Sequence, residues 1–199
     1  AKRFIFEGDL HKSLFYVKRG LEIDPRNLKL YLLKSFINRK CKRYEQALKD
    51  IEHGSTYLNL YSECEKEIKE SLAITYNEMG IDMMEKERYE DAIELFTEGL
   101  KFKNNDWGMV ANKGDCYLKL KEFQKALEEY KIAWELGGNN ANLKLRFGLA
   151  HYYQALNFFN QKKYQECINK IEAALKWDKN NADYMTLKGL CHSLLGDSK

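Results

Sequence analysis

Apolar residues recur every three or four positions along almost the whole chain, in stretches separated by short polar turns. This spacing places apolar side chains on one face of a helix. No alternation with a period of two persists between turn residues, so the pattern predicts no strands. The chain contains one proline, Pro25, which leaves long helices unbroken elsewhere. We therefore expect an all-α protein.

The helical pattern is itself repeated. Residues 107–140 reproduce the pattern of residues 73–106 after a shift of thirty-four positions. In this alignment Gly80 matches Gly114, Tyr89 matches Phe123, Ala92 matches Ala126, and Phe96 matches Tyr130. We expect a single array over 1–199 with full units at 28–61, 73–106, 107–140 and 148–181, and partial units at 1–27 and 182–199. The partial units lead us to expect a piece of a longer protein.

Two segments exceed the period, at 62–72 and 141–147. Eleven and seven residues correspond to about three and two helical turns, so either segment can lengthen a helix without rotating its apolar face. We predict a long helix over about 63–85, and another over about 142–160 with a partner helix at 164–177. Residues 2–6 would be the end of one further helix.

The recurring small residues have a mechanical role in this pattern. A glycine in the middle of a helix costs about 1 kcal/mol relative to alanine. Close packing of a second helix would offset that cost, so we expect close contacts at Gly80, Gly114 and Gly189. Cys116, Cys167 and Cys191 stand at or near such positions, and we interpret them as small apolar residues of the core.

A thirty-four-residue helix-turn-helix with these glycine, aromatic and alanine positions resembles the tetratricopeptide repeat family. The resemblance is weaker in the first full unit, where Ser35 replaces the glycine of the first helix. It implies a right-handed superhelical solenoid of antiparallel helix pairs. It also implies that the first helices line a concave groove, which binds a peptide or helix of a partner protein.

One subset of this family binds acidic carboxy-terminal tails of chaperones through a clamp of Lys, Asn, Asn, Lys and Arg. In the units that begin at 73, 107 and 148, the five clamp places hold Asn77, Ile81, Asn112, Leu149 and Tyr153. Only Asn112 agrees with the clamp, and a register one unit earlier agrees nowhere. We therefore expect a groove without the carboxylate clamp.

The resemblance assigns a mostly apolar set of residues to the groove: Leu32, Phe36, Ile74, Asn77, Ile81, Met84, Asn112, Asp115, Tyr152, Leu156 and Phe159. These side chains could bind an amphipathic segment, or they could form core contacts between neighbouring helices. A basic run also stands out at a predicted turn, with Arg39, Lys40, Lys42 and Arg43. It is either a solvated helix end or a contact for an acidic partner.

Charge and composition narrow the function classes. The chain has 33 Lys and Arg against 30 Asp and Glu, and these charges are interleaved, so the net charge of +3 favours neither nucleic acid nor a membrane as partner. No run approaches the roughly 20 apolar residues of a membrane-spanning helix. The five cysteines and four histidines show no metal-ligand spacing, so we expect no metal and no cofactor. Free thiols favour a reducing, intracellular location, and we expect the cytoplasm.

These observations predict a non-enzymatic scaffold that binds a segment of a partner protein in its groove. The alternative is an architectural component of a cytoskeletal, ciliary or other large assembly, which would use the convex surface and the ends of the array. The sequence leaves the oligomeric state open.

Overall fold

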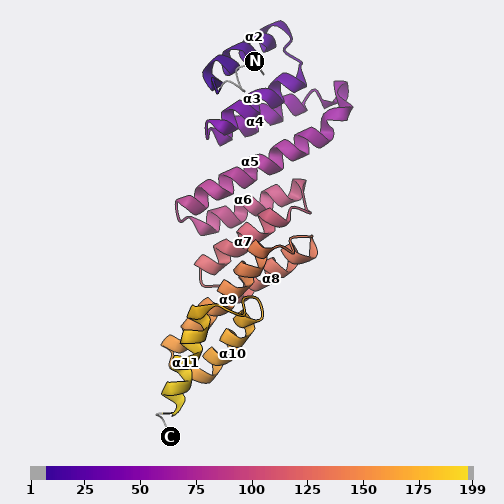
Figure 1. The fold of residues 1–199 in the computed structure, drawn as a ribbon. Helices are drawn as coiled ribbons and strands as arrows, with labels where there is room; N and C mark the ends of the chain where they lie inside the picture. The colour runs from indigo at the N-terminus through magenta and orange to yellow at the C-terminus, as the bar shows by residue number, and fades with distance from the viewer. Residues whose placement is uncertain (1–7, 197–199) are drawn as a thin grey trace. The chain divides into compact units, whose positions relative to one another are not determined.

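The computed structural model describes residues 8–196, and within this range every regular element is helical (Figure 1). The α-helices are α2 (Leu10–Ile23), α3 (Leu28–Lys40), α4 (Tyr44–Ser55), α5 (Glu65–Glu85), α6 (Tyr89–Phe102), α7 (Trp107–Lys119), α8 (Phe123–Glu135), α9 (Ala141–Asn160), α10 (Tyr164–Leu175) and α11 (Ala182–Gly196). Two short 3-10 helices, Leu58–Leu60 and Ser62–Cys64, precede α5. The expectation of an all-α protein is confirmed.

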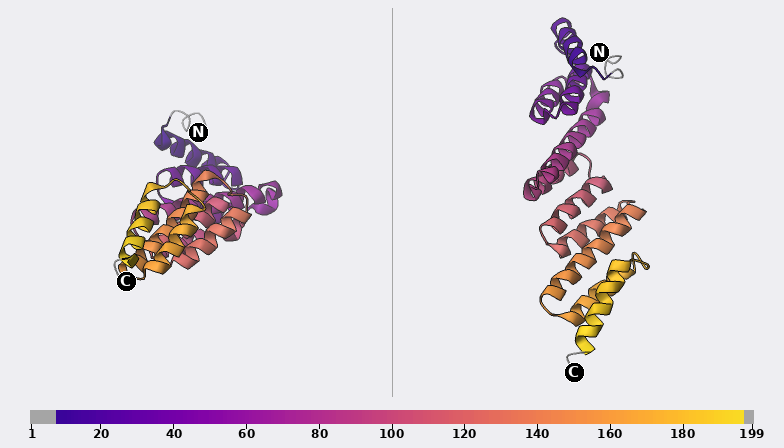
Figure 2. Two further views of the ribbon diagram at one scale, coloured as in Figure 1. Left: turned by 60° about the horizontal axis from the view of Figure 1, so that its bottom comes forward. Right: turned by 60° about the vertical axis from the view of Figure 1, so that its left-hand side comes forward.

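The chain divides into two compact units. The first contains the described residues up to Asp82 together with Thr97–Asn104, and the second contains Met83–Phe96 together with the described residues from Asn105 onward. In the first unit α3 packs against both α2 and α4. In the second unit each helix from α7 to α11 packs against the next along the chain (Figure 2). Both units are thus built by helices that pack on their sequence neighbours.

The two long helices lie where the excess segments are. α5 begins at Glu65, because residues 62–64 form a 3-10 turn, and it ends at Glu85. α9 covers Ala141–Asn160, and α10 ends at Leu175, two residues before the predicted end of this partner helix. The predicted helical turn at residues 2–6 lies outside the described residues.

Four turns between paired helices share one backbone conformation. Each contains a non-glycine residue in the left-handed region: Lys42 (φ 55°), Glu87 (φ 58°), Lys121 (φ 62°) and Lys162 (φ 59°). In the third turn the Lys121 amide donates to the Leu118 carbonyl (3.1 Å) and the Glu122 amide to the Tyr117 carbonyl (2.9 Å). The other three turns repeat both hydrogen bonds at matching positions. The turns therefore repeat in structure as well as in sequence.

The core repeats in the same register. The small residue of the second helix in each pair is completely buried, and a large residue four positions later is at most 1% exposed. The small residues are Ala47, Ala92, Ala126 and Cys167, and the large ones are Ile51, Phe96, Tyr130 and Ile171. Burial of these side chains contributes the main favourable free energy for the packing of these second helices.

The predicted close contact exists at Gly114 and not at Gly189. A Cβ added to Gly114 would lie 2.5 Å from Cε1 of Tyr130, on α8. A Cβ added to Gly189 would meet no atom within 4 Å, because no described helix follows α11 to pack on it. The expected contact at Gly189 therefore has no counterpart among the described residues and stays a prediction.

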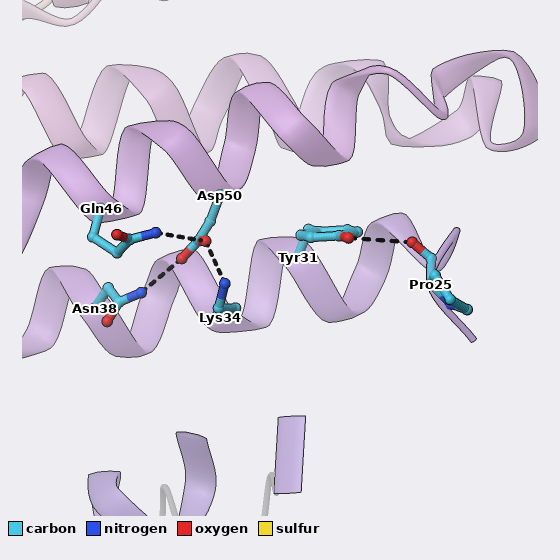
Figure 3. Close-up of polar contacts among 6 residues, drawn as sticks. All are labelled: Pro25, Tyr31, Lys34, Asn38, Gln46 and Asp50. Atoms are coloured by element: carbon cyan, nitrogen blue, oxygen red, sulfur yellow. Dashed lines mark hydrogen bonds and ion pairs between the residues drawn. The ribbon is translucent and has the colours of Figure 1, made fainter. Parts of the chain in front are cut away.

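In the first unit a buried carboxylate ties α3 to α4 (Figure 3). Asp50 of α4 is 3% exposed and accepts hydrogen bonds from Lys34 (2.7 Å), Asn38 (2.6 Å) and Gln46 (3.2 Å). A buried carboxylate is costly unless it is paired and hydrogen-bonded. The three donors meet that requirement, and the two that lie on α3, Lys34 and Asn38, fix the position of α4 along α3.

The Gly114 contact generates a paired prediction. Gly114→Ala should destabilise the second unit by about 1–3 kcal/mol, because the added methyl group displaces the buried Tyr130 ring. Gly189→Ala should instead stabilise it by up to about 1 kcal/mol, because alanine favours the helix and meets no neighbour. Urea unfolding followed by circular dichroism measures both changes. Equal effects of the two substitutions would contradict the close-packing account.

The left-handed turns generate a second prediction. Lys121→Gly should leave stability unchanged or raise it by up to about 1 kcal/mol, because glycine relieves the left-handed strain and loses part of that gain through the freedom of the unfolded chain. Lys131→Gly, in the exposed interior of α8, is the matched control and should cost about 1 kcal/mol. The midpoint temperatures of thermal unfolding of the two variants measure these changes. An equal loss of stability in both variants would refute backbone strain at Lys121.

Candidate partner-binding site

The predicted groove residues are distributed over both units, so each unit is described by itself. In the first unit Ile74 and Ile81 of α5 are exposed, whereas Leu32 of α3 packs against the buried cluster around Ile51. The Phe36 ring, also on α3, is half-buried. Asn77 of α5 is half-buried as well, and its buried Oδ1 has no hydrogen-bond partner. Of the predicted groove residues in this unit, Ile74 and Ile81 are therefore the large apolar side chains that are exposed enough to contact a partner.

The basic run is largely neutralised within the first unit. Arg39 is 7% exposed and forms an ion pair with Glu78 of α5, and its guanidinium lies 5.3 Å from the centre of the Phe36 ring. Lys40 Nζ lies 3.7 Å from Glu78, and Lys42 Nζ lies 3.0 Å from Asp82.

Arg43, at the start of α4, remains exposed. Arg39 is therefore paired within the unit, and a contact of the basic run with an acidic partner stays a prediction for its exposed members. Glu78, the carboxylate that pairs with Arg39, lies 39 residues later in the chain. No local sequence pattern reveals a pair that far apart.

In the second unit Asn112 and Asp115 of α7 belong to one polar network. Arg146 Nη2 of α9 donates to Asn112 Oδ1 (3.3 Å) and lies 2.9 Å from Asp115 Oδ2. The Tyr130 hydroxyl donates to Asp115 Oδ1 (2.8 Å). Arg146 comes from the excess segment 141–147, so this segment supplies the cation that engages the one clamp-like asparagine.

Arg146 stabilises the negative charge of Asp115, a residue that is mostly buried. Burial raises the pKa of the Asp115 carboxyl, while the charge of Arg146 and the hydrogen bond from Tyr130 act in the opposite direction. Asp115 therefore interacts with Arg146 of α9 and Tyr130 of α8, and little of its negative charge remains available to a ligand.

Three further groove residues lie on α9 and contact the core. Tyr152, Leu156 and Phe159 are half-buried and pack against the cluster that α9, α10 and α11 share. The Tyr152 ring centre lies 4.9 Å from that of Tyr184, and the Phe159 ring centre lies 5.7 Å from that of Tyr164. The core interpretation of the apolar stripe therefore applies to these three residues, and their partial exposure leaves binding of a partner segment as a prediction.

The remaining residue of the predicted groove set is Met84, near the end of α5, which is also half-buried.

A cleft of about 300 Å³ lies between the α7–α8 turn and α9, and we call it the α7–α9 cleft. Its apolar residues are Leu118, Phe123, Tyr153 and Leu156, and its polar residues are Lys119, Lys121, Asn157 and Asn160. No carboxylate lines it, and the Tyr153 ring is 44% exposed. The predicted groove set contains only Leu156 of these residues. The spacing of Tyr153, Leu156, Asn157 and Asn160 on one face of a helix is a signal that could have found the others.

A second cleft of about 360 Å³ lies between α8 and α9, and we call it the α8–α9 cleft. Its lining comprises Gln124, Leu127, Glu128, Lys131, Trp134, Phe147, His151 and Trp177. Phe147 stacks on Trp177 with ring centres 4.3 Å apart, and Trp134 meets Trp177 edge-on at 5.5 Å. The sequence analysis did not identify this cleft, although it contains two of the three tryptophans of the chain.

His151 is the titratable ring of the α8–α9 cleft. Its Nδ1 is buried without a hydrogen-bond partner. Burial, followed by the nearby charges of Lys170 and Lys176, lowers the pKa of the imidazole. The ring is therefore neutral at physiological pH and extends the apolar wall.

Among residues 8–196 no three His, Cys, Asp or Glu side chains come together in a way that could hold a metal ion. In the same range none of the helices combines the length and the apolar character needed to span a bilayer.

Comparisons with known proteins were made for the whole chain, and no protein-family model matches it. The chain is 21% identical over 193 residues to human tetratricopeptide repeat protein 16, an alignment that covers 95% of this chain and 22% of that protein. It is 31% identical over 106 residues to dynein axonemal assembly factor 4 of Pongo pygmaeus, covering 51% of this chain and 24% of that protein. The chain thus spans about a quarter of the length of these curated relatives.

Among solved structures, the chain is similar to YrrB, described as a TPR protein with an unusual peptide-binding site. The TM-score is 0.51 at 19% sequence identity, over 90% of this chain and 84% of that one. This likeness concerns the fold, and it agrees with the repeated turns and the repeated core register described above. The chain therefore has the helical fold of tetratricopeptide-repeat proteins and is similar in sequence to proteins of that name.

Proposed function

We propose that the chain is a non-enzymatic interaction scaffold that binds a peptide or helix of a partner protein on its first helices, with the α7–α9 cleft as the main contact. The observation that carries this proposal is the combination of an apolar floor and exposed cationic and amide groups in one cleft. The predicted groove residue Leu156 belongs to it. Binding clefts are typically concave and apolar, with a few polar groups that orient the ligand.

The chemistry of the cleft indicates what kind of segment it suits. Leu118, Phe123 and Leu156 offer apolar contacts, and the exposed Tyr153 ring adds the type of side chain that often dominates interface energies. Lys119 and Lys121 form no ion pair in the described part of the chain, so their ammonium groups can donate to carbonyl or carboxylate oxygens of a ligand. A segment with one bulky apolar side chain would fill such a space.

The polar network supports binding without the chaperone-tail clamp. Asn112, which matches the clamp pattern, already accepts a hydrogen bond from Arg146. The neighbouring clamp places hold Leu149 and Tyr153, which carry no positive charge. A carboxy-terminal carboxylate would therefore have to displace Asp115 from Arg146 to be held at this place.

An architectural role is the alternative, and the α8–α9 cleft is the observation that favours it. Trp134 and Lys131 belong to the second helix of a pair, and Trp177 follows another second helix, so this cleft offers aromatic groups apart from the α7–α9 cleft. One relative carries a name that ties it to the assembly of axonemal dynein. For the scaffold we propose an intracellular, cytoplasmic location, and for the alternative a cytoskeletal or ciliary one.

Substitution of Tyr153 in the α7–α9 cleft, and of one exposed residue of α8 outside that cleft, separates the two roles. Tyr153→Glu should reduce the capture of bound cellular proteins at least about tenfold, equivalent to 1.4 kcal/mol, because a charge replaces the exposed apolar contact. Ile132→Glu is the matched control, since Ile132 is 46% exposed on α8, and it should leave capture unchanged. Quantitative mass spectrometry of proteins captured by each variant and by wild type measures the effect.

Loss of capture with Ile132→Glu alone would contradict binding in the α7–α9 cleft and favour the architectural role. Tyr153 is preferable to Tyr152 or Phe159 for this test because those two side chains pack on the core, so their substitution would also disturb folding.

The absence of the clamp can be tested with a short acidic peptide. A heptapeptide with acidic residues and a free carboxy-terminal aspartate should show no saturable binding at concentrations up to about 1 mM, a limit that corresponds to about −4 kcal/mol. Isothermal titration calorimetry on the folded chain makes this measurement. Micromolar binding that disappears in Asn112→Ala would overturn the clamp-free assignment.

A further inference from the structure

The thiols of Cys167 and Cys191 face each other across two neighbouring helices. Cys191 Sγ, on α11, donates to Cys167 Sγ, on α10, at a sulfur–sulfur distance of 3.3 Å. Both residues are completely buried. A disulfide bond is about 2.05 Å long, so the two sulfur atoms would have to approach by only about 1.3 Å to become bonded.

The pair differs from the other buried cysteines of the chain. Cys64 and Cys116 are also completely buried, but the described residues place no second sulfur within hydrogen-bonding distance of either. Cys41 is partly exposed. Packing alone explains a small apolar side chain at position 167 or at position 191. It does not require that two thiols occupy the same contact.

We propose that Cys167 and Cys191 form a site of oxidative modification, at which hydrogen peroxide converts the two thiols into a disulfide that links α10 to α11. In the first step one thiol loses its proton to solvent, its thiolate attacks a peroxide oxygen, and the O–O bond breaks to give a sulfenic acid and hydroxide, which takes up a proton to become water. In the second step the other sulfur attacks the sulfenic sulfur, the S–O bond breaks, and a second water leaves. Two thiols lose two electrons and two protons, and one peroxide is reduced to two waters.

The surroundings determine how fast the pair reacts. Burial, together with the hydrogen bond from Cys191, raises the pKa of the Cys167 thiol to about 12, and the thiolate is the reactive form. The first step therefore depends on a local opening that brings a sulfur into contact with water. α11 packs along α10, so separation of these two helices is the opening that exposes both sulfurs. Once one sulfur is oxidised, the adjacent second thiol makes the disulfide form faster than further oxidation.

Tryptic peptides provide a specific readout. Cleavage after Lys163, Lys170 and Lys188 places Cys167 in peptide 164–170 and Cys191 in peptide 189–199. The folded chain is treated with hydrogen peroxide, remaining thiols are alkylated, and the non-reduced digest is analysed by mass spectrometry. We expect the linked pair 164–170 with 189–199 as the main disulfide, its loss on reduction, and a melting temperature higher by about 5 °C or more in the oxidised protein.

Two variants make the test decisive. Cys116→Ser removes a buried thiol that has no sulfur neighbour and should leave the 164–170 to 189–199 link unchanged. Cys191→Ser should abolish that link while peptide 164–170 is recovered with an oxidised or alkylated Cys167.

The proposal is overturned if peroxide fully oxidises Cys41 and the linked pair remains absent. It is overturned as well if the link appears only above the urea concentration that unfolds the second unit, together with other pairings. A separate mild-urea series below that concentration should accelerate the reaction, because it favours the opening of α11.

Discussion

The fold depends on how closely the two helices of each pair can approach. In the pair α7 and α8 this distance is set by Gly114, against which the buried Tyr130 ring lies, while the Tyr130 hydroxyl reaches Asp115. The equivalent large side chains of two other pairs are aliphatic, Ile51 and Ile171, and they are buried to the same degree. Because the contact between paired helices is fixed by a few small and large residues, other faces of the first helices are free to vary.

Ion pairs between successive first helices use most of the charge beside the expected groove. In the first unit Arg39 of α3 pairs with Glu78 of α5, and in the second Arg146 of α9 pairs with Asp115 of α7. Such partly buried pairs fix geometry more than they add stability. Because these charges are paired, the surface that stays open beside them carries apolar, aromatic and lysine side chains. The α7–α9 cleft is lined by side chains of these kinds and by two asparagines.

The periodic pattern was sufficient to predict the helices and the residues they bury. Ala47, Ala92 and Ala126 occupy the same place in successive pairs, and one short-range rule accounts for all of them. Contacts between residues far apart in the chain could not be predicted in this way. The partner of Arg39 lies on another helix pair, and the contact between Cys167 and Cys191 depends on how α11 is rotated about its axis.

The candidate site was only partly predictable for the same reason. Leu156 was found because it continues an apolar stripe, whereas Tyr153 and Lys121 join the cleft through the conformation of a turn and the packing of α9 against α7. At Gly189 the expected close packing stays a prediction, because no helix among the described residues follows α11.

A partner segment bound in the α7–α9 cleft would lie within reach of the exposed side chain at position 153. Site-specific photocrosslinking in cells tests this contact most directly, with a photoreactive amino acid placed at position 153 in one variant and at position 132 in another. We expect covalent adducts with a partner protein from position 153 and none with the same partner from position 132. Adducts from position 132 alone would contradict this expectation.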